Sequence, residues 1–532
     1  MDNKSLLTDE LLNKFGTKDS INISELINKL KILNELCPNP NPKLPFFDRQ
    51  ENKFSISQSP KNDQEIFSNF SKYISNCMNW KSPRMQFSVT PPVTISSVAT
   101  SSIASLLNQN GVWDVATGDF IKLEIGLSDY FSNLVNWKKA SGIFTFGGTA
   151  TNMYGIKIGL EKSGNNLNKK GIGTNNYVIS NLEGHSCHST VCNWLGIGSD
   201  NCIRINNDKE GFVDTSELFT KVEELMKNKK KISCIILNGG THFDGRIDPI
   251  RKISEEIIRL KNKYKLDYTP HIHVDSVTGW VFLLYGSYDF SKNKFNFPKE
   301  INEKLESVFK KVKDIEFADS YGVDFHKTGF CSYLSSMFLT KNEKDWEKIA
   351  GDDSIFLHES FNFGKYKPGQ FTLETSRPMN GAISAYTTLN SLGIEGIQKI
   401  IANYFYISKD IHKKLKNTGK FLIANEDSDN WTTIFLIKPN AEMDTFDKLY
   451  CADKSTIQFN NNIQKEFYDY LVKKYNNSLP WHIGFAKSYK IGKAETNISG
   501  LKSFPMSPFH STTDNDDFAN WISNELNQFS KE

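Results

Sequence analysis

The chain has 532 residues, of which 38% are hydrophobic, 12% aromatic and 23% charged, a balance that excludes an intrinsically disordered protein. Its 64 basic and 61 acidic residues leave a net charge of +3, so the overall charge gives no reason to expect nucleic acid or an anionic membrane as ligand. No stretch approaches the roughly 20 apolar residues of a membrane span, and the N-terminus has no apolar core of signal-peptide length.

The N-terminal region is polar and predicts one amphipathic helix followed by a linker. Four apolar residues recur there at helical spacing: Leu26, Ile27, Leu30 and Leu33. Ser24 is a suitable N-cap for this helix. Four prolines interrupt residues 31–48, which we therefore expect to form a linker. We assign residues 1–110 to an N-terminal helical segment.

The following region alternates between short apolar strands and amphipathic helices. The predicted strands are 177–180, 202–206, 234–238, 271–275 and 335–340. The clearest helices between them are 214–228 and 249–264. This alternation predicts a large α/β domain with a mainly parallel sheet at 111–385, followed by a smaller α+β domain at 386–532. Ligands of such sheets bind beyond the carboxyl ends of the strands, so functional residues should follow the strands.

Two strand ends carry charged residues that suit a cofactor. In ADSYGVDFHKTGF (318–330), Lys327 follows a short strand, although an exposed turn explains such a lysine equally well. Asp275 ends the apolar strand HIHVD, where a buried carboxylate is costly without a cationic partner. A protonated pyridine nitrogen is one such partner. A cap of the next loop or helix is the plain alternative for Asp275.

A glycine turn within SGIFTFGGTATNMYGIKIGLEK (141–162) suits an anion. Gly147, Gly148 and Thr149 open an amphipathic helix there, and backbone N–H groups at a helix N-terminus together with a hydroxyl can bind phosphate. The turn has neither the GxGxxG spacing of a dinucleotide loop nor the lysine of a P-loop. Because Gly-Gly turns are common, this turn alone does not identify a phosphate-binding site.

The segment 181–205 combines histidines and cysteines: His185, Cys187, His188 and Cys192. Their spacing lacks the CxxC and HExxH patterns of zinc sites, so a zinc hydrolase is remote and no metal is expected. A histidine stacked on a cofactor ring is the favoured interpretation, and a structural histidine is the alternative. The eight cysteines of the chain form no CxxC pair and predict reduced thiols of a cytoplasmic protein.

Taken in this order, the four segments resemble those of the group II pyridoxal-phosphate decarboxylases, which include the glutamate, aspartate, tyrosine and aromatic amino-acid enzymes. The resemblance runs from about residue 83 to the C-terminus, and further similar stretches lie at 105–127, 237–250, 371–393 and 507–517. It implies a type I aminotransferase-like α/β fold with pyridoxal 5'-phosphate as cofactor. It also implies a homodimer with the active site at the subunit interface, acting on a small-molecule amino acid.

The resemblance assigns roles to individual residues. Lys327 would carry the cofactor as a Schiff base, and Asp275 would pair with its ring nitrogen. His185 would stack on the ring, because Leu195 and Gly196 follow it at the spacing of the family. The other cofactor-binding positions are Gly148, Thr149, Thr241, His242, Val277, Asp324 and His326. Tyr366, in the glycine-rich loop 358–377, would return a proton to Cα of the substrate.

The expected reaction is decarboxylation of an L-amino acid to its amine and carbon dioxide through an external aldimine and a quinonoid. His242, Val277 and Phe325 depart from the usual threonine, alanine and proline, so the reaction can differ. The alternatives are an aldehyde synthase or a carbon–carbon lyase on the same fold, and a non-catalytic homologue acting as a binding dimer. Lys502 lies where some relatives place a basic residue, which leaves both acidic and tyrosine-like substrates open.

Overall fold

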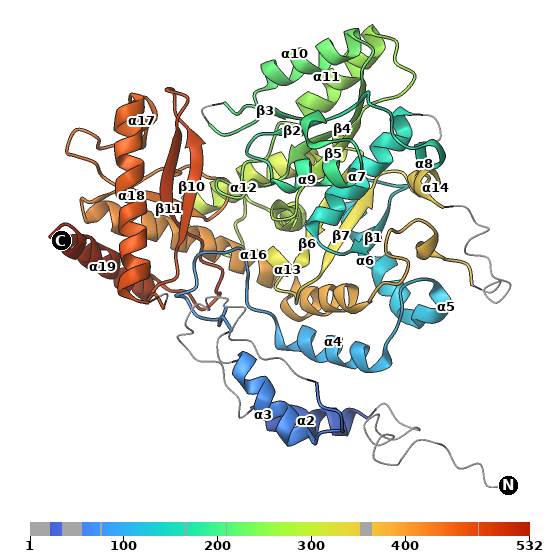
Figure 1. The fold of residues 1–532 in the computed structure, drawn as a ribbon, viewed down its shortest axis with the longest axis horizontal. Helices are drawn as coiled ribbons and strands as arrows, with labels where there is room; N and C mark the ends of the chain where they lie inside the picture. Colours follow the sequence, from blue (N-terminus) through green and yellow to red (C-terminus); the bar gives the residue numbers. More distant parts are fainter. Residues whose placement is uncertain are drawn as a thin grey trace.

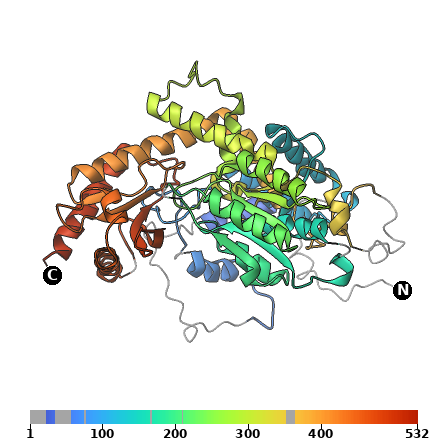
Figure 2. The same cartoon turned by 90° about the horizontal axis from the view of Figure 1, so that it is seen from above.

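A computed structural model describes residues 22–34, 56–74, 77–164, 167–208, 210–351, 364–476 and 478–531. Two β-sheets organise the chain, a seven-stranded one within residues 141–340 and a four-stranded one within residues 421–503 (Figure 1). The long helix α16 (Asn380–Asn417) connects them and kinks at Gly393. Figure 2 shows the two lobes beside each other.

The larger sheet has the order β1-β7-β6-β5-β4-β2-β3. Its strands are β1 (Ser141–Thr145), β2 (Asn176–Asn181), β3 (Cys202–Ile205), β4 (Lys231–Asn238), β5 (His271–Asp275), β6 (Ser320–Asp324) and β7 (Ser336–Thr340). Only β7 runs against its neighbours β1 and β6, so the other six strands share one direction. Their carboxyl ends therefore lie along one edge of the sheet.

Helices cover both faces of this sheet because successive side chains of a strand point to opposite faces. In β4, Cys234 and Ile236 pack with α7 and α9, whereas Ile235 and Leu237 join the main core with α10 and α11. The helices of this lobe are α6 (Ile121–Leu134), α7 (Gly148–Ser163), α8 (Leu167–Lys170), α9 (Cys187–Trp194), α10 (Thr215–Lys227), α11 (Ile250–Lys263), α12 (Lys299–Val312), α13 (Phe325–Thr328) and α14 (Asp345–Ile349). A strand buried on both faces explains the unbroken apolar run of β4.

The smaller sheet is antiparallel, with the order β10-β11-β9-β8. Its strands are β8 (Phe421–Ile423), β9 (Thr433–Ile437), β10 (Gly484–Ile491) and β11 (Asn497–Ser503). Three further helices accompany it: α17 (Phe446–Tyr450), α18 (Lys454–Lys474) and α19 (Thr512–Phe529). A separate apolar cluster from α16, α18, α19 and the strands β8, β9 and β11 gives the lobe its own core.

The N-terminal helices are α2 (Ile23–Asn34), α3 (Asp63–Ile74), α4 (Ile95–Leu107) and α5 (Asp114–Thr117). The helix predicted from the apolar spacing is confirmed as α2, but the predicted cap is wrong, because the helix begins at Ile23 and Ser24 lies inside it. The predicted linker falls largely outside the described residues. None of the described helices is long and apolar enough to cross a membrane.

A buried ion pair joins the large sheet to the chain entering α16. Arg377 donates to both carboxylate oxygens of Glu124 at 2.8 and 2.9 Å, and the two side chains are 3% and 0% exposed. Arg377 also donates to the carbonyl oxygens of Phe144 and Gly111. One side chain thereby ties α6, β1 and the segment before α16 together.

We expect Arg377→Leu to lower the free energy of unfolding by about 3–5 kcal/mol, because it leaves Glu124 charged and buried without its partner. The matched control is Lys122→Leu, which removes the exposed pair with Asp119 and should cost less than about 1 kcal/mol. Urea unfolding of the two variants measures the difference. Equal unfolding midpoints would contradict the structural role of the buried pair.

Candidate active site

Five loops meet at the carboxyl edge of the large sheet, following β1, β2, β4, β5 and β6. Their side chains are in contact there: Asn152 of α7 and His188 of α9 both bond to Asp275, the last residue of β5. Lys327, in the helix after β6, lies close enough to Asp275 for this carboxylate to raise the pKa of the lysine. This edge brings together residues from distant parts of the sequence.

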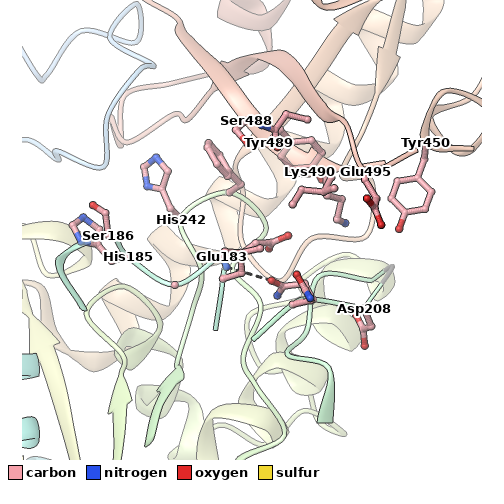
Figure 3. Close-up of a pocket in the computed structure, with 17 residues that line it drawn as sticks. Glu183, His185, Ser186, Asp208, His242, Tyr450, Ser488, Tyr489, Lys490 and Glu495 are labelled. Atoms are coloured by element: carbon pink, nitrogen blue, oxygen red, sulfur yellow. Dashed lines mark hydrogen bonds between the residues drawn. The ribbon is translucent and has the colours of Figure 1, made fainter. Parts of the chain in front are cut away.

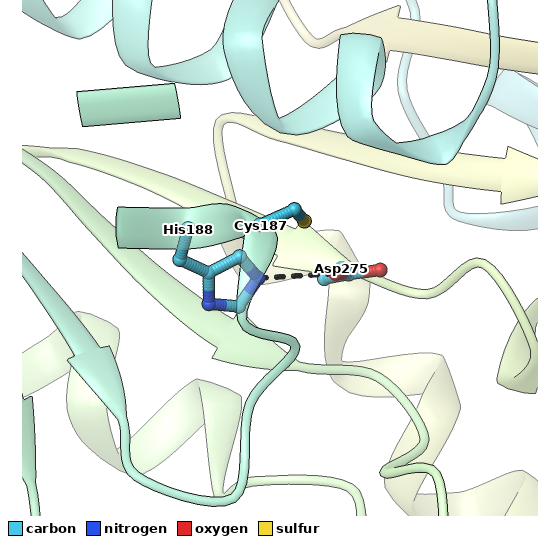
Figure 4. Close-up of side chains that lie close together, drawn as sticks. All are labelled: Cys187, His188 and Asp275. Atoms are coloured by element: carbon cyan, nitrogen blue, oxygen red, sulfur yellow. Dashed lines mark hydrogen bonds and ion pairs between the residues drawn. The ribbon is translucent and has the colours of Figure 1, made fainter. Parts of the chain in front are cut away.

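Asp275 is the centre of this arrangement and is only 7% exposed. Its Oδ2 accepts a hydrogen bond from Asn152 Nδ2 at 3.0 Å. It accepts a second one from His188 Nε2 at 3.1 Å, which is drawn in Figure 4. We assign the proton of His188 to Nε2 because a carboxylate can only accept, and Ser180 Oγ lies 2.6 Å from Nδ1. Among the described residues, Asp275 Oδ1 has no hydrogen-bond partner.

Electrostatics keep Asp275 ionised. Burial alone would raise the pKa of this carboxyl group, but His188, Lys327 and Asn152 hold it below its usual range. The result is a buried anion with one oxygen unpaired. Leaving such an oxygen unpaired costs free energy, unless a ligand donates a hydrogen bond to it, preferably from a cationic group.

Lys327 is the nearby amine. Its Nζ lies 2.9 Å from Asp324 Oδ2 and its side chain is 19% exposed. Ser336 Oγ donates to Asp324 Oδ1 at 2.6 Å and holds that carboxylate in place. Burial alone would lower the pKa of Lys327, but Asp324 and Asp275 raise it above its ordinary value. The lysine is thereby fixed as an ammonium, which must lose a proton before it can attack a carbonyl carbon.

The glycine turn opens α7 directly behind β1. Gly147 has a φ of 113°, and a Cβ added to Gly148 would lie 2.7 Å from Asp324 Oδ2 and 2.9 Å from Val277 Cγ1. A side chain at position 148 is therefore excluded. The first N–H groups of the helix have no intrahelical partner, and the exposed Thr149 follows them. The turn can bind an anion.

Two of the remaining predicted residues, His326 and Val277, lie at this centre, and Thr241 lies in the loop after β4. His326 is buried, with Nδ1 3.0 Å from the carbonyl oxygen of Ser335 and its ring 4.1 Å from that of Tyr333. Val277 packs against Gly148. The hydroxyl of Thr241 accepts a hydrogen bond from the backbone N–H of Arg246 at 3.0 Å, which closes the loop after β4.

Phe325 does not line the site. Its ring is fully buried in the main core, 5.2 Å from Phe131 and 5.0 Å from Trp280. The phenylalanine that replaces the usual proline at this position therefore contributes to the core packing behind the sheet.

His185 and His242 line a cavity of about 840 Å³ beside this centre (Figure 3). Both side chains are exposed, yet desolvation by the protein around their rings lowers the pKa of both, that of His242 to about 3, with Lys502 adding to the effect. Lys502 Nζ lies 3.0 Å from His242 Nε2. Both histidines are therefore neutral at physiological pH, and His242 can accept a hydrogen bond from Lys502.

Tyr366 lies in the wall of a different cavity, with Trp346 and Phe371. Its N–H donates to Asp114 Oδ2 at 3.2 Å, and burial raises the pKa of its phenol. Residues 352–363, which include part of the predicted loop, fall outside the described residues. The role of Tyr366 as proton donor stays a prediction.

His188, Asn152 and Ser336 are site residues that sequence reasoning did not identify. The spacing to Leu195 and Gly196 favours His185 over His188 as the ring-stacking histidine and gives His188 no role of its own. Asn152 follows Gly148 by four residues, a helical spacing that puts both on the same face of α7. That spacing was the available signal for Asn152, whereas Ser336 offered none.

One group of possible metal ligands lies among the described residues. Single ligand atoms of Cys187, His188 and Asp275 are all within 4.8 Å of one another (Figure 4). His188 and Asp275 are already bonded to each other, and Asn152 occupies the same carboxylate oxygen. Burial raises the pKa of Cys187 to about 12, which keeps it a thiol, a weak metal ligand.

The residues of this edge fit pyridoxal phosphate. The unpaired Asp275 Oδ1 suits a protonated ring nitrogen. The turn at Gly148, into which no Cβ fits, suits the phosphate. Lys327 supplies the amine that would hold the aldehyde carbon.

Comparison with known proteins agrees with this fit. The family model described as the pyridoxal-dependent decarboxylase conserved domain matches residues 45–436. The chain belongs to this family. An L-2,4-diaminobutyrate decarboxylase of Acinetobacter baumannii is 22% identical over 62% of this chain and 62% of its own length. An acidic amino acid decarboxylase of Bos taurus is 23% identical over 58% of this chain and 54% of its own length. The matches thus span less than two thirds of these relatives.

Solved structures share the fold. Mouse CSAD in its apo form superposes with a TM-score of 0.75 at 14% identity, covering 94% of this chain and 99% of that chain. Oryza sativa TDC with PLP and tryptamine gives 0.72 at 13% identity, covering 99% of both chains. The predicted type I aminotransferase-like α/β fold of this pyridoxal-dependent decarboxylase family member is confirmed.

We expect His188→Phe to weaken the binding of pyridoxal phosphate by about 10- to 100-fold, because Asp275 loses a hydrogen bond to a charged group. Titration of apo-protein with the cofactor, followed by absorbance, measures this affinity. His412→Phe is the matched control, since His412 is also buried but bonds to Thr433 in the smaller lobe. Similar affinities in the two variants would show that His188 does not act through Asp275.

Proposed function

We propose that the protein decarboxylates an L-amino acid to its amine and carbon dioxide, with pyridoxal phosphate held on Lys327. The observation that carries this proposal is the buried Asp275, with its Oδ1 unpaired, in the same site as Lys327. A carboxylate in that environment suits a protonated ring nitrogen better than any neutral ligand. The names of the two relatives add support, since both are decarboxylases.

Each residue then has a separate task. Pyridoxal phosphate, when bound, draws into its ring the electrons that departing carbon dioxide leaves on Cα. Asp275 keeps the proton on the ring nitrogen, and His188 and Asn152 keep Asp275 ionised and oriented. Gly148 and Thr149 bind the phosphate at the N-terminus of α7. His185, which lines the adjoining cavity, would stack on the cofactor ring.

Lys502 is suited to bind the α-carboxylate of the substrate. It is 7% exposed, and no carboxylate of the described chain lies within ion-pair distance of its Nζ. Its hydrogen-bond partner is the neutral His242, which can orient the ammonium group without cancelling its charge. A substrate carboxylate would supply the missing negative charge.

Apolar residues near the site support a homodimer with the active site at its interface. Phe146, Tyr333 and Leu334 are large apolar side chains that remain exposed. They flank the glycine turn and His326, since Leu334 lies beside Gly147 and Tyr333 packs on His326. An apolar surface at the rim of a polar site is typical of a protein interface.

The reaction is tested by product analysis after incubation of holoenzyme with single amino acids. We expect equal amounts of amine and carbon dioxide, and aldehyde with ammonia would instead identify an aldehyde synthase. If Tyr366 donates the proton to Cα, Tyr366→Phe lowers amine formation about 100-fold or more. Tyr406→Phe, an exposed tyrosine of α16, is the control. Unchanged amine formation in Tyr366→Phe would remove Tyr366 from the mechanism.

The role of Lys502 predicts a pH dependence. Burial lowers the pKa of Lys502 to about 8, so its ammonium is present below that pH and lost above it. We expect kcat/KM to fall as pH rises through about 8 in the wild type. In Lys502→Arg the guanidinium stays charged, so this fall should disappear. An identical pH profile in both proteins would contradict the assignment.

A further inference from the structure

The cavity that begins at His185 and His242 continues between the two lobes to an acidic wall (Figure 3). Three carboxylates from separate segments line it: Glu183 after β2, Asp208 after β3, and Glu495 between β10 and β11. Lys490 is the one lysine among the lining residues that the structure describes. The end of the cavity away from the two histidines is therefore electronegative.

The cations near this wall already have partners. Lys490 Nζ lies 3.5 Å from Asp244 Oδ2, and Asp244 is 1% exposed. Arg246 lies 3.6 Å from Asp429 and donates to two carbonyl oxygens. Neither cation can neutralise another carboxylate without weakening the interactions it already makes.

Glu183 is the least exposed of these three carboxylates. Its N–H donates to Asn181 Oδ1 at 2.8 Å and to Asn207 Oδ1 at 3.2 Å, which fixes its position in the loop. Across the described chain, no hydrogen bond or ion pair engages its carboxylate. Burial, then Asp244 and Asp248, raises the pKa of Glu183 to about 8, although Lys490 and Arg246 act in the opposite direction. A cation at this position would restore the ionised form.

We propose that Glu183 binds a positively charged group at the end of the substrate side chain, so that the enzyme acts on amino acids with a terminal ammonium or guanidinium group. The inference rests on the proposed decarboxylase function. Glu183 is two residues from His185, so their Cα atoms are at most about 7 Å apart. A short aliphatic chain can span the distance from the cofactor side of the cavity to this carboxylate.

Other side chains fit this wall less well. A carboxylate at the end of the substrate would face three carboxylates with only the paired Lys490 in opposition. An aromatic ring would bury Glu183 further and leave it without a partner. Lys502, in contact with His242 of the cavity wall, and Glu183 in the same wall instead match the two charges that such a substrate carries in addition to its α-amine.

The substrate class is tested with L-ornithine, L-norvaline, which has the same carbon chain without the terminal amine, and L-glutamate. We expect holoenzyme to show a kcat/KM for carbon dioxide release that is at least about tenfold higher for ornithine than for the other two. Calorimetric binding of α-methylornithine gives a second readout that does not depend on turnover.

The variant Glu183→Gln keeps the shape and removes the charge. It should lower kcat/KM for ornithine and affinity for α-methylornithine at least about tenfold, with norvaline changed less than about twofold. The control Glu224→Gln makes the same change on the exposed face of α10 and should alter neither. Equal losses for all substrates in Glu183→Gln would mean a structural role and overturn the inference.

The two proposals fail in different ways. Faster carbon dioxide release from norvaline or glutamate than from ornithine would overturn the substrate class and leave decarboxylation standing. Absence of carbon dioxide and amine from every amino acid tried with cofactor-loaded protein would overturn the proposed function, and the substrate class with it.

Discussion

The buried carboxylate of Asp275 is the constraint on which the site depends. A strand whose five residues are all buried ends there in an acid, and a charge in such a place is stable only with partners. His188 and Asn152 each supply one hydrogen bond to the same oxygen. The helices α7 and α9 must therefore both meet the end of β5, and the other oxygen is left for a ligand.

The contacts that Asp275 requires also fix the positions of the other site residues. Since α7 supplies Asn152, its N-terminus with Gly148 lies at the same edge, against Val277 and Asp324. Asp324 in turn holds Lys327. The six co-directional strands make this convergence possible, because their following loops all emerge on one side. The residues proposed to bind the cofactor are thus brought together by the same strand arrangement that defines the fold.

Much of the large sheet was predictable because its strands are continuous apolar runs. The predictions for β2 to β5 and β7 are confirmed within a few residues. β1 was not predicted, since SGIFT is short and leads directly into the glycine turn. The bond between His188 and Asp275 joins residues 87 apart, and the one between Lys502 and His242 joins residues 260 apart. Such contacts follow from strand order and lobe packing, which local sequence patterns do not encode.

The most direct test is the covalent attachment of the cofactor. Purified protein loaded with pyridoxal phosphate is reduced with borohydride, digested, and its peptides are identified by mass spectrometry. The account predicts a phosphopyridoxyl group on the peptide that contains Lys327, and none in Lys327→Ala. A phosphopyridoxyl group on another lysine of the wild type, or on none, would contradict it.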